Sequence, residues 1–332
     1  MELKTERYIS EELISLLEKT SLGTNGAVYK HLDIKKQALL TDNPLSLLLI
    51  RNQKLIGNIT FCERPFGFYL RYFTFESLFQ NSGKSSRKSK GNSPIKKEIQ
   101  QFFESCLNKN GMLYAYIDPK NKRSLNMAET FGLEIKSLLT TQAYSRYFPK
   151  KSKRFRLIED WLEIKECVES TYGAQFGYTD THICRGPYGA VYNEHDELIA
   201  FAKFNKATWE IERFPGKYGK LIPKVLPYIP LLKKIINPKK FSFLVPDIVW
   251  VDKNNPNLLT ELFNAALNHY ACNSIIWWTD ENQGIYQAAK AQVKWGLLHR
   301  LLGNNPLALV QKSLHQEIKE EELIFVNGFD LI

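Results

Sequence analysis

The sequence predicts a mixed α/β protein built from two similar lobes in tandem. The chain has 332 residues, about the length of two domains of ordinary size. Each half contains the same order of expected elements: a strand, a turn, a helix, a strand that ends in aspartate, a helix that ends at glycine, and a last strand. The aspartates are Asp118 and Asp280, and the glycines are Gly132 and Gly296. Few residues are identical between the halves, so the repeat is inferred from pattern and order.

The first half begins with an amphipathic helix over residues 9–20, for which Ser10 is a suitable N-cap. Two apolar runs in Ser46–Phe61 flank the turn formers of Arg51–Lys54, which predicts a β-hairpin. The aromatic run Phe66–Phe75 is typical of a third, buried strand.

A basic loop then separates this sheet from a helix. Asn81–Ser93 contains no apolar residue, and Pro94 after it suits the first position of a helix. We expect a strand at Met112–Asp118, a helix at Asn121–Phe131 and a last strand at Leu138–Phe148.

The basic run Lys150–Arg156 suggests a connector. We therefore predict an N-terminal lobe at 1–150 and a C-terminal, degenerate lobe at 151–332. The alternative is a surface loop within one larger domain. For the second lobe the pattern predicts a hairpin across residues 190–204, strands at 208–213 and 241–251, a helix from Pro256, a strand at 274–280, a helix at 285–294 and a strand at 307–314.

Composition narrows the class of protein. A hydrophobic fraction of 44% with 24% charged residues is ordinary for a folded globular chain. The sequence has no stretch long and apolar enough for a membrane span and no secretory signal, which favours a cytoplasmic protein without integral membrane association. The apolar segment Leu221–Ile236, flanked by lysines, is expected to be buried or lid-like, with a membrane-surface contact as the alternative. No cysteine or histidine pair has metal-site spacing, so no metal is expected.

The segment Asn121–Glu134 (NKRSLNMAETFGLE) resembles the last conserved block of the GNAT acyltransferase superfamily. That block reads approximately N-x-x-[AS]-[IL]-x-[LM]-Y-E-x-x-G-F. The matching residues are Asn121, Ser124, Leu125, Met127, Glu129 and Gly132. The resemblance implies two tandem GNAT-like acyl-CoA N-acyltransferase folds, in which acyl-CoA lies between two parallel strands that splay apart.

The resemblance also implies a place for the pyrophosphate of the cofactor, acetyl-CoA or another acyl-CoA. It would lie over the loop before the helix at Pro94, where backbone N–H groups and the helix dipole favour an anion. The alternative is a flexible, solvated loop with incidental lysines. The residues assigned to the cofactor are Arg87, Lys88, Lys90, Gly91, Asn92 and Ser93, with Asn121 from the later block.

One departure concerns the acid of the reaction. Ala128 stands where the family usually has a tyrosine that protonates the leaving thiolate, and a methyl group has no proton to give. Tyr116 or Tyr144 could replace it, water could do so, or the lobe does not acetylate. For the base, Glu76 is the first candidate and Glu63 the second, each with a solvated strand-end glutamate as the alternative.

The second lobe lacks glycines in the corresponding loop at 252–257, so we expect it to complete the substrate site or to be structural. Three functions follow. The first is acetyl transfer from acetyl-CoA to a primary amine of a small molecule. The second is a Fem-type aminoacyl-tRNA-dependent transferase, which the net charge of +10 also suits. The third is an inactive GNAT-like binding or regulatory protein. No specific nucleic acid is expected, since the basic run lacks interleaved aromatic residues. The acids Glu210, Glu212 and Asp247, with Tyr286 and His299, are candidates to line a substrate cleft, with a structural role as the alternative for each.

Overall fold

A computed structural model describes residues 2–23, 26–75, 94–314 and 322–332. The chain forms two compact units. Unit 1 comprises residues 1–137 and 308–317, and unit 2 comprises residues 138–307 and 318–332. The chain therefore passes from one unit to the other near the end of each half of the sequence. Residues 76–93, and with them Glu76, Arg87, Lys88, Lys90, Gly91, Asn92 and Ser93, lie outside the described residues.

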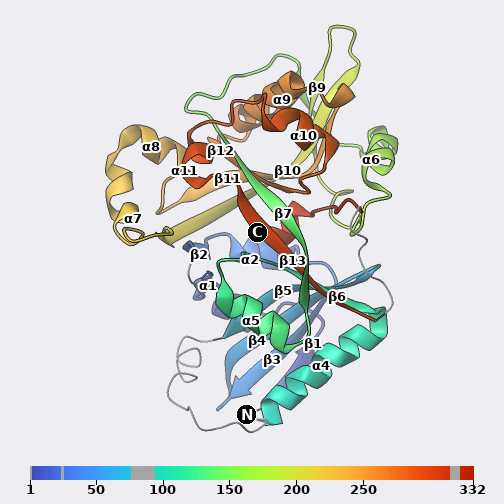
Figure 1. The fold of residues 1–332 in the computed structure, drawn as a ribbon, viewed down its shortest axis with the longest axis vertical. Coiled ribbons are helices and arrows are strands. Elements are labelled where there is room, and N and C mark those ends of the chain that lie inside the picture. The colour runs from blue at the N-terminus through green and yellow to red at the C-terminus, as the bar shows by residue number, and fades with distance from the viewer. Residues whose placement is uncertain (1, 24–25, 76–93, 315–321) are drawn as a thin grey trace. The chain divides into compact units, whose positions relative to one another are not determined.

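Unit 1 contains a mixed sheet with helices on both faces (Figure 1). Its strands follow the order β1-β3-β4-β5-β6-β13, and β2 also belongs to this unit. The helices are α1, α2, α4 and α5. The bounds are β1 Glu2–Glu6, α1 Glu11–Glu18, β2 Val28–His31, α2 Ile34–Leu39, β3 Pro44–Arg51, β4 Lys54–Arg64, β5 Gly67–Phe75, α4 Pro94–Asn110, β6 Met112–Ile117, α5 Lys122–Thr130 and β13 Asn305–Ser313.

Local signals in the sequence position these elements. Ser10 caps α1 by accepting a hydrogen bond from the N–H of Leu13 at 3.4 Å, as its side chain predicts. The β3–β4 hairpin turns at Asn52 and Gln53, both at positive φ, which a two-residue hairpin turn requires.

Two apolar cores hold unit 1 together, one on each face of the sheet. On one face, Phe103 of α4 and Phe131 after α5 pack against Phe61 and Phe68 of the sheet. On the other, α1 and α2 pack against the opposite side of β3 and β4. Both faces of the sheet can be apolar because successive side chains of a strand point to opposite faces.

Unit 2 contains a second mixed sheet, in the order β7-β12-β11-β10-β9-β8. Helices α9 and α10 pack on one face, and α6 packs on the other. The bounds are β7 Glu134–Ser145, β8 Phe155–Ile158, α6 Lys165–Tyr172, β9 Tyr188–Tyr192, β10 Leu198–Arg213, α7 Ile222–Val225, α8 Pro230–Ile235, β11 Phe241–Val251, α9 Pro256–His269, β12 Ser274–Thr279, α10 Gly284–Lys290 and α11 Leu297–Leu302, with 3-10 turns at Trp161–Glu163, Leu226–Tyr228, Asp252–Asn254 and Gly328–Leu331.

The two units share one strand pattern. In each, an antiparallel hairpin is followed by a third antiparallel strand, then a parallel neighbour, then a final antiparallel strand. The last strand predicted for each half belongs to the sheet of the other unit. The strand predicted at Leu138–Phe148 pairs with β12 in unit 2, and Ala308–Ser313 pairs with β6 in unit 1. The apolar pattern of the Leu138–Phe148 strand fits either sheet, so this pattern does not show which strand it pairs with. The boundary predicted at residue 150 thus falls inside unit 2, and the roles predicted for the two lobes stay predictions.

Candidate functional site

In unit 1 the parallel strands β5 and β6 pair only near their beginnings. Phe68 is opposite Leu113 and Tyr69 is opposite Tyr114, and no later pair follows between the two strands as described. Both strands continue for several residues beyond these pairs. Beyond these two pairs no ladder joins the carboxyl ends of β5 and β6, and strands that diverge in this way can accept an extended ligand through strand-like hydrogen bonds.

A β-bulge lies on β5 at the point where the pairing with β6 ends. Thr60 of β4 is opposite Tyr72, but the next residue, Phe61, is opposite Leu70, so Arg71 is the extra residue. A bulge bends its strand and leaves a backbone group out of the ladder. The Arg71 Nε donates a hydrogen bond to the Tyr72 hydroxyl at 3.0 Å, which holds the guanidinium beside the bulge.

A row of tyrosines covers one face of the same strands. On β6, Leu113 and Ala115 belong to the core under α4, whereas Tyr114 and Tyr116 alternate to the opposite face. The ring of Tyr116 lies 5.7 Å from that of Tyr69, centroid to centroid, and 6.1 Å from that of Tyr114. Tyr116 is half-buried, whereas Tyr69 and Tyr114 are almost fully buried. Of the three, Tyr116 is thus the hydroxyl nearest the carboxyl ends of the strands and the most accessible.

Strand β2 lies near the diverging carboxyl ends of both β5 and β6, which we call the opening of unit 1. The Asp118 carboxylate, just after β6, helps burial raise the pKa of Tyr29 to about 12. Burial, together with the nearby Arg71 guanidinium, lowers the pKa of His31 to about 3. At neutral pH Tyr29 is therefore protonated and His31 is neutral. An imidazole with so low a pKa is too weak a base to take a proton from an ammonium group.

Unit 2 repeats this geometry between β11 and β12. Leu244 is opposite Ile275 in the parallel pair, and a bulge follows on β11 at Asp247 and Ile248. Asp247 is buried and accepts hydrogen bonds from Asn205 Nδ2 at 2.6 Å and from the N–H of Phe329 at 2.8 Å. Burial raises the pKa of this carboxyl, while Lys203 and the two hydrogen bonds oppose the rise.

The residues Leu323–Ile332 lie against β11 at its bulge and against the end of β12. Besides the bond from Phe329 to Asp247, the N–H of Ile324 donates to the Asp280 carboxylate at 3.0 Å. Gly328 packs so closely that a Cβ there would lie 2.6 Å from Val245 Cγ1. In unit 2 the space beside the bulge is therefore occupied by residues of the chain itself.

The described site residues of the sequence analysis have these positions. Asn121 is the N-cap of α5, and its Oδ1 accepts a hydrogen bond from the N–H of Ser124 at 3.2 Å. Gly132 ends the helix at a φ of 78°, a conformation that glycine adopts readily. Ala128 is buried in the apolar core of unit 1. The block therefore has the local structure that its spacing predicts, whereas a contact of Asn121 with a cofactor stays a prediction.

Two alternative residues have structural partners. Glu63 forms an ion pair with Lys109, whose hydrogen bond and charge lower the pKa of the glutamate, the opposite of what a general base needs. Glu63 also pairs with Phe68, at the start of β5 rather than at its open end. Tyr144 is fully buried in unit 2, where its hydroxyl accepts a hydrogen bond from Asn264 Nδ2 at 2.9 Å and burial raises its pKa.

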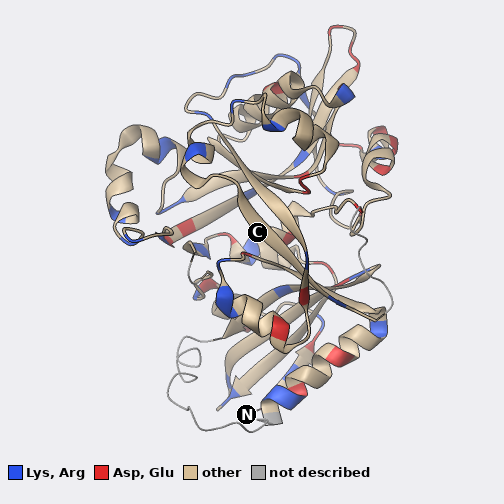
Figure 2. Ribbon diagram, viewed as in Figure 1, with Lys and Arg blue, Asp and Glu red and all other residues tan. Residues whose placement is uncertain are grey.

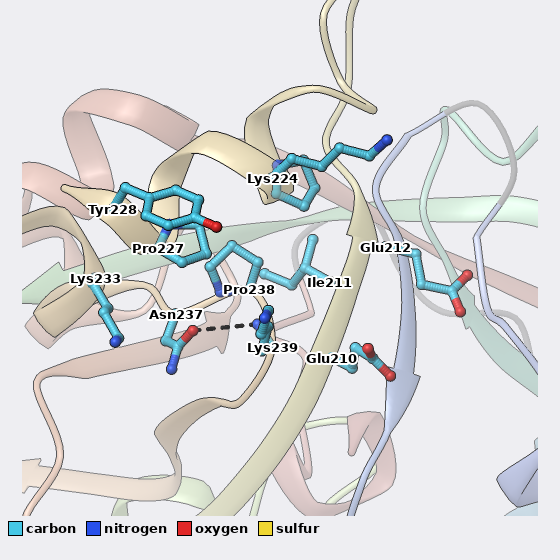
Figure 3. A pocket seen from close by; sticks show the side chains of 11 residues that line it. Glu210, Ile211, Glu212, Lys224, Pro227, Tyr228, Lys233, Asn237, Pro238 and Lys239 are labelled. Atoms are coloured by element: carbon cyan, nitrogen blue, oxygen red, sulfur yellow. Dashed lines mark hydrogen bonds between the residues drawn. The ribbon is translucent and has the colours of Figure 1, made fainter.

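The candidates of the second half do not form one cleft. Glu210 and Glu212 line a pocket of about 620 Å³ beside α7 and α8 (Figure 3), which does not include the other three candidates. Tyr286 is buried and bonded to Asn304, and His299 Nδ1 is 3.1 Å from Gln142 Nε2. Within the described ranges, no group of three or more His, Cys, Asp or Glu residues is arranged to hold a metal ion.

The sequence analysis missed the residues around the opening of unit 1, which are Tyr29, His31, Tyr69 and Arg71. No signal marks a bulge at Arg71, since a bulge depends on how the neighbouring strand pairs. The aromatic alternation of Tyr114 and Tyr116 was visible and could have indicated that both share one face.

A search of solved structures finds proteins that share this arrangement over nearly the whole chain. A tandem GNAT protein from the clavulanic acid biosynthesis pathway aligns with a TM-score of 0.51 and 11% identity, covering 94% of this chain and 98% of that one. The chain has a tandem GNAT-like fold. The N-myristoyltransferase of Saccharomyces cerevisiae with bound myristoyl-CoA also aligns with this fold, with a TM-score of 0.56 and 9% identity, covering 99% of this chain and 87% of that one.

At these identities the likeness of the tandem GNAT-like fold is one of structure alone. No protein-family model matches the sequence, and no curated protein matches it. None of the helices within the described residues is long and apolar enough to cross a membrane.

Proposed function

We propose that the chain is an acyl-CoA-dependent N-acyltransferase and that unit 1 binds the acyl-CoA between β5 and β6. The observation that carries the proposal is the loss of pairing after Tyr69 and Tyr114, together with the bulge at Arg71. The pantetheine arm is an extended chain with amide groups, so it can add to the edge of β5 that faces β6 as a strand does. The structural neighbours include a protein with bound myristoyl-CoA, which supports this class of ligand.

The comparison of the two units favours unit 1 as the cofactor site. In unit 2 the N–H of Phe329 already bonds to the carboxylate at the bulge, and Gly328 lies in close contact with β11. A ligand there would have to displace these contacts. In unit 1 the bulge is at Arg71, and we propose that the backbone at this bulge contacts the cofactor.

The proposed reaction transfers an acetyl group to a primary amine. The amine nitrogen attacks the thioester carbonyl carbon, and a backbone N–H at the bulge on β5 stabilises the oxyanion. The C–S bond then breaks, and the CoA thiolate receives a proton from the hydroxyl of Tyr116. A base, for which Glu76 remains our candidate, removes a proton from the amine.

The phosphates of the cofactor are assigned to the loop before α4. In the sequence, Arg87, Lys88 and Lys90 supply positive charge, and Gly91, Asn92 and Ser93 immediately precede α4, whose first turn can present N–H groups to an anion. The first turn of α4 as described carries no acidic residue, so nothing in it opposes an anion.

Calorimetry with acetyl-CoA tests the assignment of the loop. Reversing two charges in Lys88→Glu/Lys90→Glu should raise the Kd at least about tenfold, because two attractive charges become repulsive. The matched control Lys151→Glu/Lys153→Glu makes the same charge change on exposed residues of unit 2 and should leave the Kd within about a factor of two. Equal affinities of the first variant and the unmodified protein would remove the loop from the site.

A second function has one specific observation in its favour. Ala128 lies in the core at the position of the usual acid, which suits a protein that binds acyl-CoA without transferring from it. Binding of acetyl-CoA with no transfer to any of a broad panel of amines would support this alternative. Transfer to one of them would support the enzyme.

A further inference from the structure

The segment Phe214–Lys240 of unit 2 joins β10 to β11 and carries an unusual composition. It contains seven lysines and five prolines but no aspartate or glutamate. We call it the lysine-rich segment. Its prolines and two short helices, α7 and α8, give it a folded path along one edge of unit 2 (Figure 1).

A few apolar residues anchor the lysine-rich segment to unit 2. Leu226, Ile235 and Ile236 are buried. Ser274 Oγ donates a hydrogen bond to the carbonyl of Ile235 at 2.8 Å, and the N–H of Ile211 donates to that of Pro238 at 2.7 Å. These contacts hold the segment at its end near β11. The segment can therefore stay folded without burying its remaining apolar residues.

Most of the other apolar side chains of the segment face solvent. Of the two states expected for 221–236, buried or lid-like, the exposure of these side chains contradicts the first. Tyr228 is 85% exposed, Leu231 57% and Leu221 54%. Exposed apolar side chains that cluster on one element mark an interaction surface, whereas single ones do not. The exposed apolar residues of the segment are Tyr218, Leu221, Ile222, Val225, Tyr228, Ile229 and Leu231.

Positive charge surrounds this apolar cluster. All seven lysines of the segment are exposed, and none lies within ion-pair distance of a carboxylate among the described residues. Figure 2 shows basic but no acidic colour on α7 and α8. Lys234 lies over the ring of Phe148, at 3.9 Å from its centroid, so another exposed aromatic ring adjoins the cluster. Two acids of β10, Glu210 and Glu212, line the pocket beside the segment, and their side chains point away from Tyr228 and Lys233 (Figure 3).

We propose that the lysine-rich segment binds the surface of an anionic lipid bilayer. A bilayer interface accepts aliphatic side chains such as Leu221 and Leu231 below its headgroups, while lysines contact the anionic lipids and tyrosines lie at the interface. Five of the seven exposed apolar residues of the cluster are aliphatic and offer no face on which a base can stack, which argues against a nucleic acid. The inference does not depend on acyl-CoA binding in unit 1.

Sedimentation of the full chain with vesicles tests the proposal. The protein should bind vesicles of phosphatidylcholine with about 30% phosphatidylserine and bind phosphatidylcholine alone far more weakly. Lys224→Glu/Lys233→Glu/Lys239→Glu should weaken binding to the anionic vesicles at least about 100-fold, since each lysine contributes and each reversal repels. Leu221→Ser/Val225→Ser/Leu231→Ser should weaken it at least about tenfold, because apolar burial is lost.

Controls use the same kinds of residue elsewhere on unit 2. Lys151→Glu/Lys153→Glu and Leu162→Ser/Leu301→Ser change exposed side chains outside the segment and should bind vesicles as the unmodified protein does. Circular dichroism confirms that each variant is folded. Absence of binding to the anionic vesicles, equal binding to neutral ones, or an equal loss in the controls would overturn the proposal. So would binding of an oligonucleotide with no binding of vesicles.

Discussion

Replacing Tyr116 with phenylalanine should lower kcat about 100- to 10,000-fold, the contribution typical of a positioned acid, while the Kd for acyl-CoA stays nearly constant. The phenyl ring keeps the contacts with Tyr69 and Tyr114, which lie 5.7 and 6.1 Å away between ring centroids. Only the proton donor is lost. The measurement is the steady-state rate with the best acceptor from the amine panel, beside calorimetry with acetyl-CoA.

A matched variant separates this role from packing. Tyr114 alternates to the same face of β6 but is almost fully buried, so Tyr114→Phe should leave kcat within about a factor of three, since it removes no proposed proton transfer. If Tyr116→Phe transfers at the unmodified rate, water or another group protonates the thiolate, and the assignment of Tyr116 is wrong.

Replacing Phe103 with alanine should lower the free energy of unfolding of the chain by about 3–5 kcal/mol. The Phe103 side chain is 2% exposed, and its ring stacks on that of Phe131 at 4.2 Å and meets that of Phe61 edge-on at 5.0 Å, centroid to centroid. Its removal leaves a cavity between α4, the end of α5 and the sheet, where the lost contacts and the void both cost stability.

Urea denaturation measures this loss. Phe148→Ala is the control, since Phe148 is 75% exposed and its truncation should change the free energy by no more than about 0.5 kcal/mol. A loss below about 1 kcal/mol for Phe103→Ala would mean that α4 is not packed on the sheet as described.

Much of the fold follows from signals that are local in the sequence. Ser10 as an N-cap, the turn at Asn52 and Gln53 and the block from Asn121 to Gly132 each carry a physical cause within a few residues. These signals, and the order in which they repeat, were sufficient to indicate a tandem GNAT-like fold, and the comparisons confirm it.

The pairing of distant strands could not be predicted in the same way. The apolar pattern of β7 satisfies either sheet, and only packing decides that its residues from Thr140 to Ser145 pair with β12. The bulges at Arg71 and Asp247 depend on register between strands, which single-strand patterns do not contain. For this reason the sequence analysis named Tyr116 as a candidate acid but none of the residues beside the opening, and the role of Tyr116 stays a prediction. The cofactor assignments from Arg87 to Ser93 lie outside the described residues and stay predictions.

A crystal structure of the chain with a non-hydrolysable acetyl-CoA analogue tests the central claim most directly. We predict that the pantetheine arm lies between β5 and β6 of unit 1, with the carbonyl that replaces the thioester facing the backbone at Arg71 and its sulfur position near the Tyr116 hydroxyl. An analogue bound instead beside β11 and β12 of unit 2, or no bound analogue at concentrations well above the Kd of acetyl-CoA, would contradict it.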